Sequence, residues 1–377
     1  MKIFIVSSGY PTKDYKGNGI FEFDQAKALA SLGHEVNLLA VDLRSIRRKR
    51  HWGIEYLTKE GISITCINLP IGRMHSSIID SIGKHALGYL FNKLVDEVGY
   101  PDIIHAHFTN MGYYSIDISK KNKIPLVVTE HSSLINQEVI RKKLVLKASR
   151  LYSQADCVIA VSQSLSDNIK KKFEINALIV PNIVDVDTFK YSEKIDGDEF
   201  SIVSVANLVY SKRIDMLVQA FGHAFKNNDN VKLYIYGDGP ERSRIQAIID
   251  KNNINRKVSL CGAQTRDVIA SKLTESDFFV LASQTETFGV VYIEALSVGV
   301  PVIATKCGGP EDFIDGNNGY LIRVDDYEQL VEALRYMYEN AKNYNREKIS
   351  QNIREKFSPI VVGKKLEQIY LKTLIKN

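Results

Sequence analysis

The chain contains 377 residues, of which 45% are hydrophobic and 25% are charged. This length exceeds what one hydrophobic core usually supports, so it predicts two domains, and the composition excludes a disordered or fibrous chain. The formal net charge of +5 is modest. It does not indicate a nucleic-acid partner, because such proteins usually concentrate basic residues on one face.

Apolar segments and cysteines favour a cytoplasmic protein. The apolar run at residues 2–6 is too short for a signal peptide and is interpreted as a strand. No window approaches the roughly 20 apolar residues of a membrane-spanning helix, so any membrane association is expected to be peripheral. The cysteines are far apart and mostly in apolar runs, which predicts buried thiols rather than disulfides or a metal site. They are Cys66, Cys157, Cys261 and Cys307.

The first half of the chain alternates short β-branched runs with longer amphipathic segments, a pattern typical of a parallel sheet covered by helices. Gly33 is placed to end the first helix by adopting a left-handed conformation. In chain order, strands are expected at 2–7, 36–41, 62–68, 103–107, 126–129 and 157–161, and helices at 21–32, 78–97 and 139–154.

The second half repeats this alternation. Strands are expected at 200–205, 231–236, 258–261, 278–282, 301–305 and 320–324, with a helix at 214–226 and further helical segments between the strands. The polar stretch 185–199 is interpreted as a linker, and 359–376 as a closing helix. The predicted domains are therefore residues 1–184, with a C-terminal helix at about 359–377 packing back on them, and residues 200–358.

The predicted fold class is α/β, with two doubly wound, Rossmann-like domains facing each other across a cleft. Such sheets bind ligands at the carboxyl ends of their strands, so the loops after strands are candidate sites. One of them contains Gly17 and Gly19, just before a helix whose first N–H groups and dipole favour an anion. The spacing is not that of dinucleotide enzymes, and a simple tight turn explains it equally well.

The strongest constellation lies in the second half, where Glu286 and Glu294 flank the start of a predicted helix. Glu286 is expected in the loop after a strand and Glu294 about two turns into the helix. Gly289 between them permits close backbone approach. For an isolated pair of glutamates, a helix-entry acid and a solvated helix acid would be the simpler interpretation.

With these residues in place, the chain resembles the retaining glycosyltransferases of the two-Rossmann GT-B class, specifically family four. The resemblance covers nearly the whole chain. It includes the Glu-x7-Glu signature and the segments 101–107, 129–131, 180–185 and 237–240. It implies retaining, metal-independent transfer of a hexose-type sugar from a nucleotide-diphosphate donor to a glycan or lipid-linked acceptor in cell-surface polysaccharide synthesis. It implies no cofactor and does not specify the sugar.

The resemblance also implies roles for individual residues. Glu286 would contact the hydroxyls of the donor sugar, and Glu294 would hold the ribose of the nucleotide. Phe288 and Gly289 would offer backbone N–H groups to the diphosphate. Lys212 corresponds to the family's diphosphate-binding lysine, whose charge would stabilise the departing nucleotide. Otherwise Lys212 is an exposed lysine on a loop.

The chain departs from the family pattern at one position before that lysine. The usual Gly-Arg pair is replaced by Ala206 and Asn207. Asn207 can donate a neutral hydrogen bond but supplies no charge, so Arg213 would compensate if its side chain points inward.

Histidines follow the strands of the first half. His105 and His107 alternate to the same side of a strand, or diverge where the strand ends. The resemblance implies that His107 faces the reaction centre and hydrogen-bonds the donor sugar or the acceptor hydroxyl, whereas His105 is expected to be structural. His131 is expected on the acceptor side, or as a loop cap.

A metal site is the competing interpretation. Asp196 and Asp198 match the Asp-x-Asp pattern of metal-dependent transferases. They lie in the predicted linker before a strand, and oxygen-ligand metal sites need convergent acids, so no metal is expected.

The densest basic run spans residues 44–52 and ends in the only tryptophan, Trp52. Such a run beside an aromatic residue suits the surface of an anionic leaflet, and peripheral contact with the inner face of the membrane is one interpretation. A solvated loop is the other. Basic residues that could extend the patch are Lys142, Lys143, Lys147 and Arg150.

Two other classes of function stay open. A sugar-nucleotide epimerase uses a similar double-domain fold and would turn over donor without any acceptor. A non-catalytic nucleotide-sugar-binding subunit is suggested by the missing arginine at Asn207, although the presence of Glu286, Lys212 and Glu294 argues against it.

Overall fold

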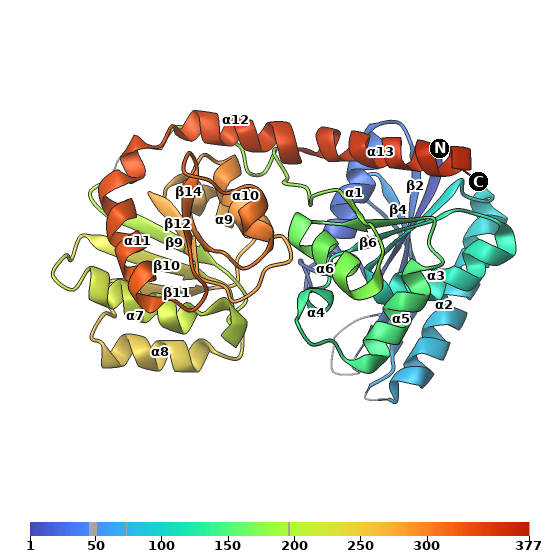
Figure 1. Ribbon diagram of the computed structural model, residues 1–377, viewed down its shortest axis with the longest axis horizontal. Helices are drawn as coiled ribbons and strands as arrows, with labels where there is room; N and C mark the ends of the chain where they lie inside the picture. Colours follow the sequence, from blue (N-terminus) through green and yellow to red (C-terminus); the bar gives the residue numbers. More distant parts are fainter. Residues whose placement is uncertain (45–50, 73, 195–196, 377) are drawn as a thin grey trace. The chain divides into compact units, whose positions relative to one another are not determined.

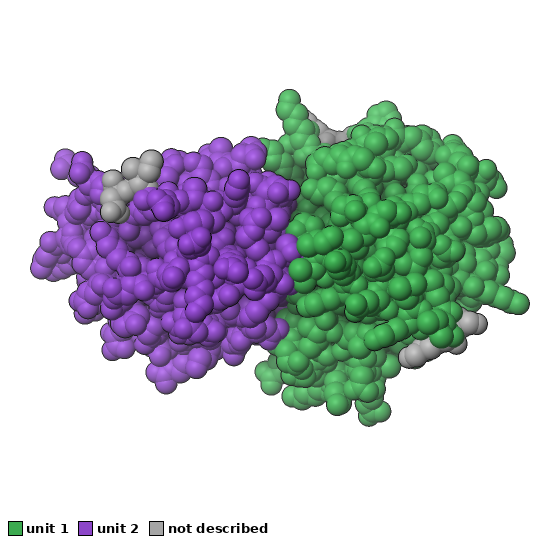
Figure 2. All heavy atoms as spheres, turned by 90° about the horizontal axis from the view of Figure 1, so that it is seen from above, with its two compact units in different colours: residues 1–183, 359–377 green, residues 184–358 purple. Residues whose placement is uncertain are grey.

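The computed structural model describes residues 1–44, 51–72, 74–194 and 197–376. The chain forms two compact units, shown in different colours in Figure 2. Unit 1 comprises Met1–Ile183 and Pro359–Asn377, and unit 2 comprises Val184–Ser358, which includes the segment expected to be a linker. Among the described residues, no helix has the length and apolar character needed to cross a membrane.

Unit 1 is built on a sheet with the order β3-β4-β2-β1-β5-β6-β7-β8. Neighbouring strands are parallel except β3 and β4, which form an antiparallel hairpin through Glu60 and Gly61, both with positive φ. Such a two-residue turn matches the natural twist of a hairpin. The strands are β1 Lys2–Ser7, β2 Glu35–Arg44, β3 Gly53–Lys59, β4 Ile62–Pro70, β5 Ile103–His107, β6 Leu126–Glu130, β7 Cys157–Ala160 and β8 Leu178–Ile179.

Helices cover both faces of this sheet (Figure 1), with α1 and α13 on one face and α2, α3 and α5 on the other. The sequence pattern did not predict α3 or α6. No turn residue separates α3 from the strand before it, because the helix begins directly after His107. The helices are α1 Ile20–Ser31, α2 Ser76–Val98, α3 Phe108–Asn122, α4 Ser133–Asn136, α5 Lys142–Tyr152, α6 Gln163–Phe173 and α13 Pro359–Lys376.

The core of unit 1 follows from the alternation of side chains along its central strand. Ile3 and Ile5 point to the face covered by α13, which contributes Val362, Leu366 and Tyr370 to the same buried cluster. Phe4 points to the other face and packs against Phe91 of α2, with ring centroids 5.8 Å apart. The last helix of the chain is therefore part of the core of the first unit.

Unit 2 contains an all-parallel sheet with the order β11-β10-β9-β12-β13-β14. In Figure 1, α7 and α8 lie on one face and α9 and α10 on the other. The strands are β9 Phe200–Val205, β10 Val231–Tyr236, β11 Val258–Gly262, β12 Phe278–Leu281, β13 Val302–Thr305 and β14 Gly319–Ile322. The helices are α7 Ile214–Ala224, α8 Arg242–Lys251, α9 Arg266–Thr274, α10 Val290–Ser297, α11 Tyr327–Asn340 and α12 Arg346–Phe357, with 3-10 turns η1 Tyr210–Lys212, η2 Gly309–Asp312 and η3 Ala341–Asn343.

The strand order of unit 2 places its candidate site. The chain winds outward from β9 in one direction through β10 and β11, and in the other through β12, β13 and β14. In doubly wound sheets, ligands bind at the carboxyl ends of the strands where the direction reverses. The segments that follow β9 and β12 contain Lys212 and Glu286 respectively, so these two side chains belong to neighbouring strand ends.

Candidate functional site

Glu286 is held by the backbone of the neighbouring loop. It forms an isolated parallel bridge with Gly308. Its N–H donates to the carbonyl of Cys307 at 3.3 Å, and its own carbonyl accepts from the N–H of Gly309 at 3.0 Å. The loops after β12 and β13 therefore fix the backbone of this glutamate before any ligand arrives.

The carboxylate of Glu286 is paired with Lys212. Lys212 Nζ lies 2.6 Å from Glu286 Oε1, and the hydroxyl of Ser283 donates to the same oxygen at 2.8 Å. The Lys212 side chain is 23% exposed and that of Glu286 11% exposed. The ammonium group is thus both charged and reachable at the edge of the sheet, as an anionic ligand would require.

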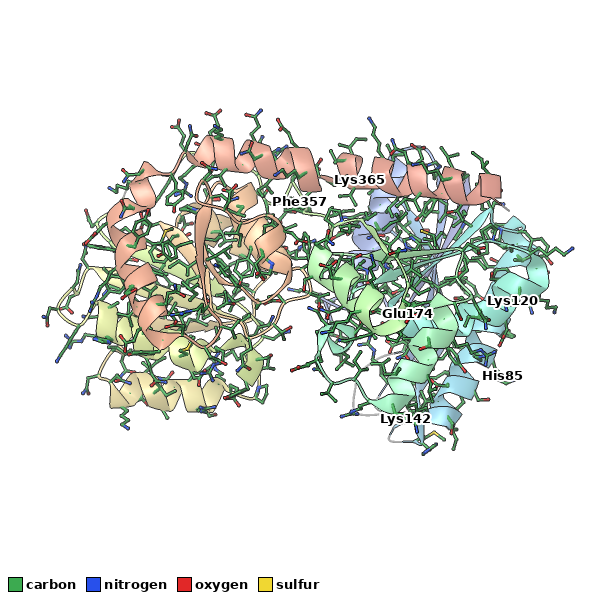
Figure 3. All side chains as sticks on the ribbon, viewed as in Figure 1. His85, Lys120, Lys142, Glu174, Phe357 and Lys365 are labelled. Carbon is green, nitrogen blue, oxygen red and sulfur yellow. The ribbon has the colours of Figure 1, made fainter. Side chains whose placement is uncertain are left out.

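The segment between the two glutamates forms the start of α10. Gly289 has φ 91, and a Cβ atom built there would lie 2.6 Å from Cδ2 of Tyr292, so only glycine fits. The ring of Phe288 is buried against Phe313 and against Phe357, which is labelled in Figure 3. The backbone N–H groups of Phe288 and Gly289 donate no hydrogen bond to any described residue. They are the free donors expected at a helix start.

The second acid of the pair has its own basic partner. Glu294 is 8% exposed, and its Oε1 lies 3.0 Å from an Nη atom of Arg266, the first residue of α9. Arg266 also lies over the ring of Phe189. The sequence interpretation missed Arg266, because no motif marks it and its partner is 28 positions away.

Asn207 is exposed, whereas Arg213 is already engaged. Arg213 adopts a left-handed conformation with φ 51 just before α7. Its Nε lies 2.7 Å from Asp325 and its Nη1 lies 3.6 Å from Asp215. The guanidinium group is therefore neutralised by two carboxylates in unit 2.

In unit 1, His105 and His107 lie on the same face of β5, with ring centroids 4.4 Å apart. Both nitrogens of His105 are used, because Nδ1 lies 2.6 Å from the hydroxyl of Tyr370 and Nε2 lies 2.7 Å from that of Thr129. Burial lowers the pKa of His105 to about 3. Its contacts are those of a structural histidine.

His107 is joined to His131 at the neighbouring strand end. His107 Nδ1 lies 3.0 Å from His131 Nε2, and the rings are stacked. Phe21 and Phe108 also pack against the ring of His131. Burial, and secondarily the neighbouring histidines, lower the pKa of His107 well below its usual value. His107 Nε2 is buried without a hydrogen-bond partner among the described residues, which costs about 1–3 kcal/mol.

Glu130 fixes the position of His131. Its carboxylate accepts hydrogen bonds from the backbone N–H groups of His131 and Ser132 and from the hydroxyls of Thr109 and Tyr152. Burial nevertheless raises the pKa of Glu130, since desolvation outweighs these donors. This carboxyl ties the loop after β6 to the start of α3 and to the end of α5.

The glycine loop after β1 is tightly packed. Gly19 has φ 65 and is the N-cap of α1, and a Cβ atom there would lie 2.1 Å from the carbonyl oxygen of Gly9. Gly17 has open space around it. In the first turn of α1, Glu22 bonds with the hydroxyl of Ser7, and burial raises the pKa of Glu22 to about 7. A carboxyl that is partly protonated near pH 7 repels an anion less than a fully ionised one would.

The family of this chain follows from the families that its sequence matches and from a related protein. Residues 185–356 match the family Glycosyl transferases group 1, and residues 21–188 match Glycosyltransferase Family 4. An uncharacterized glycosyltransferase of Methanocaldococcus jannaschii, MJ1178, is 30% identical over 76% of this chain and 78% of its own length. The chain belongs to glycosyltransferase family 4.

Other comparisons agree with membership of family 4. TuaC of Bacillus subtilis, a putative teichuronic acid biosynthesis glycosyltransferase, is 27% identical over 90% of both chains. The crystal structure of Anabaena HepE in complex with UDP-glucose superposes with a TM-score of 0.71 at 18% identity and covers 100% of both chains. The latter likeness shows the fold, which is GT-B with two Rossmann-like domains.

This family 4 chain is thus a retaining glycosyltransferase that uses a nucleotide-sugar donor. Within the described ranges, no group of three or more His, Cys, Asp or Glu residues converges as a metal site would require. Of the Asp-x-Asp pair, Asp196 lies outside the described residues.

Proposed function

We propose that Lys212 and Glu286 form the reacting centre for the donor, and that the chain transfers a hexose-type sugar from a nucleoside diphosphate to a glycan or lipid-linked acceptor. The observation that supports this most directly is the 2.6 Å contact between the Lys212 ammonium and the Glu286 carboxylate at neighbouring strand ends of unit 2. One side chain suits the anionic leaving group, and the other suits sugar hydroxyls.

During transfer, the bond between the anomeric carbon and the diphosphate breaks, and the acceptor oxygen takes its place on the same face of the sugar. The acceptor hydroxyl gives its proton to the departing diphosphate, which gains charge as the bond breaks. Lys212 and the free N–H groups of Phe288 and Gly289 would stabilise that charge. Glu286 would orient the sugar, and its negative charge would favour the positive character that develops at the anomeric carbon.

Binding of the donor would rearrange the existing ion pairs. Lys212 is neutralised by Glu286 in the free protein, so a diphosphate must share the ammonium with that carboxylate. Glu294, which accepts from Arg266 through Oε1, would use its carboxylate to bind the ribose hydroxyls. Since Arg213 is held by Asp325 and Asp215, Lys212 is the principal cation in this proposal, with Asn207 offering a neutral donor.

In unit 1, His107 would hydrogen-bond a hydroxyl of the donor sugar or of the acceptor, and His131 would support it on the acceptor side. Burial of both rings keeps them neutral, since it lowers the pKa of His131 to about 3. Gly17 and Gly19 would bring the start of α1 toward an anionic part of the ligand.

The donor is tested by thermal stabilisation of the protein with UDP-, GDP- and ADP-sugars, because a ligand that binds only the folded state raises its stability. UDP-sugars come first, because HepE was crystallised with UDP-glucose. One sugar nucleotide should raise the melting temperature of the wild type and raise that of Lys212→Ala much less. Equal stabilisation of both proteins would contradict the proposed role of Lys212.

The acceptor is tested with the donor so identified. TuaC is named for teichuronic acid biosynthesis, and the proposed acceptor is a glycan or a lipid-linked molecule, so oligosaccharides and lipid-linked oligosaccharides form the first panel. Formation of a new glycosidic bond with retained anomeric configuration supports the proposal. An epimerase would instead convert the donor sugar without acceptor, and a non-catalytic subunit would bind donor without turnover.

We also propose peripheral contact with the inner face of the membrane through residues 44–52. Residues 45–50 lie outside the described residues, and Trp52 is 61% exposed. Arg44 contributes less than expected, because its Nε is paired with Asp42. Lys142, labelled in Figure 3 at the start of α5, is exposed.

The membrane proposal is tested with vesicles of anionic phospholipid. Replacing Arg47, Arg48, Lys49 and Arg50 by Ser should weaken binding while leaving turnover of a soluble acceptor analogue unchanged, since each basic side chain contributes about 1 kcal/mol near such a surface. Equal vesicle binding by the variant and the wild type would rule out this segment.

A further inference from the structure

Among the buried polar side-chain atoms of unit 1 that lack a hydrogen-bond partner of standard geometry within the described residues are three that follow strands of its sheet: His107 Nε2, His131 Nδ1 and Asn182 Oδ1. Their side chains belong to residues that are 0%, 6% and 4% exposed. Buried polar groups are nearly always satisfied, so atoms of this kind call for an explanation.

The topology brings these residues to one edge of the sheet. His107 ends β5, His131 follows β6, and Asn182 follows β8. The strands β5, β6, β7 and β8 are parallel neighbours in that order. The segment with Asn182 is fixed to the sheet, because the N–H of Val180 donates to the carbonyl of Ala160 at 3.1 Å.

The number of protons on the two histidine rings determines which atoms donate and which accept. Burial lowers the pKa of His131 to about 3, and the nearby side chain of Asn182, which favours a proton on the ring, opposes this effect. Both histidines are therefore neutral near pH 7, and a neutral imidazole has one N–H donor and one acceptor nitrogen. The oxygen of Asn182 can only accept, so the proton of His131 belongs on Nδ1.

The proton of His107 follows from that of His131. With its proton on Nδ1, His131 has only an acceptor at Nε2, which lies 3.0 Å from His107 Nδ1. His107 must then donate from Nδ1, and its Nε2 remains a bare acceptor. The opposite assignment would leave Asn182 Oδ1 buried without any donor.

We propose that Asn182 acts through His131 as a positioning residue for His107, fixing the tautomer in which His107 Nε2 accepts a hydrogen bond from a hydroxyl of the sugar substrate. This deepens the proposed function and rests on it for the identity of the ligand. A bare imidazole nitrogen selects a donor, so it suits a sugar hydroxyl and repels an unprotonated phosphate oxygen.

The tautomers can be observed without any substrate. The full-length protein is labelled with 15N in the histidine rings, and two-bond 1H–15N correlations distinguish protonated from bare nitrogens. His107 and His131 should both show protonated Nδ1 and bare Nε2. Signals are assigned with His107→Phe and His131→Phe. A wild-type His107 protonated on Nε2 would overturn the proposal, whether or not the protein transfers sugar.

Substitutions of Asn182 test its part. Asn182→Leu removes the acceptor, so His107 should become a mixture of tautomers, whereas Asn182→Asp retains an acceptor oxygen and should keep the wild-type pattern. Tyr370→Phe is the matched control, because it deletes a buried hydroxyl bonded to His105 and should leave the His107 signals unchanged. An unaltered His107 pattern in a folded Asn182→Leu protein would overturn the role of Asn182.

Kinetics with the identified donor and acceptor give a second readout. Asn182→Leu should lower kcat about tenfold or more, because part of the His107 population would then carry its proton on the wrong nitrogen. The KM for the donor should change little. Asn182→Asp should retain most of the wild-type kcat. The effect of Asn182→Leu should vanish in a His131→Phe background, because the two residues act in series. If the losses of kcat in the two single variants add in the double variant, Asn182 does not act through His131.

Discussion

The two units hold their polar side chains in opposite electrical states. In unit 2, each acid of the Glu-x7-Glu pair forms an ion pair with a base, Glu286 with Lys212 and Glu294 with Arg266. In unit 1, burial disfavours charge, since it raises the pKa of Glu22 to about 7 and lowers that of His131 to about 3. The contrast suggests that unit 2 is equipped for an anionic nucleotide and unit 1 for uncharged hydroxyls.

The sharpest test of this contrast is the Lys212–Glu286 pair. Lys212→Ala should weaken binding of nucleoside diphosphate, because a preorganised cation is lost. It should also lower kcat/KM, with a loss of transition-state stabilisation of about 2–4 kcal/mol. Glu286→Gln should lower kcat steeply with almost unchanged nucleotide affinity, measured by calorimetry. Lys226→Ala, on the exposed end of the segment after α7, is the control. Equal loss of nucleotide in the Lys212 and Glu286 variants would show that their roles are wrongly divided.

A second test concerns Arg266. Arg266→Ala leaves the buried Glu294 carboxylate without its basic partner, so the free energy of unfolding of unit 2 should fall by about 1–3 kcal/mol. Nucleotide affinity should fall as well, since the acid that we propose to bind the ribose loses its orientation. Chemical denaturation and calorimetry measure the two effects. Arg244→Ala, which breaks an ion pair of a half-exposed arginine with Asp215, should cost less than 1 kcal/mol.

Glu22 provides the corresponding test in unit 1. Its pKa is raised from 4.5 in the unfolded chain to about 7 in the fold by burial. Stability is therefore lost as the pH rises from 4.5 to 7, and the loss is complete above 7. Glu22→Gln should relieve about 3 kcal/mol of this loss at pH 8 and almost none at pH 4.5. Melting temperatures across this range give the comparison, with the exposed Glu97→Gln as control. A pH-independent difference between the variant and the wild type would contradict the raised pKa of Glu22.

The smallest expected effect is that of chelation. Because the charges of unit 2 come from Lys212 and the start of α10 in the proposed mechanism, transfer in excess EDTA should proceed at nearly the rate measured with Mg²⁺. If activity is lost in EDTA and restored by a divalent ion, then a bound cation, rather than the protein, neutralises the charge of the diphosphate.

Much of this arrangement could be predicted from the sequence because it depends on local pattern. Strand ends follow from hydrophobic runs, so Glu286, Lys212 and His107 could be assigned to the edges of sheets. The helix α3 could not, since it begins without any turn residue after His107. The pairing of Tyr370 with His105 spans 265 positions and that of Arg266 with Glu294 spans 28. Such partners depend on tertiary packing, which periodicity does not encode.

The contribution of α13 to the core of unit 1 has a consequence for synthesis of the chain. Residues 1–183 leave the ribosome well before Val362, Leu366 and Tyr370, which complete the buried cluster. Until translation reaches them, the apolar surface around Ile3 and Ile5 stays open to water and to other nascent chains, whereas unit 2 is contiguous and can fold as it emerges. The unit that is translated first is therefore completed only after α13 has been translated, once the whole of unit 2 has already emerged.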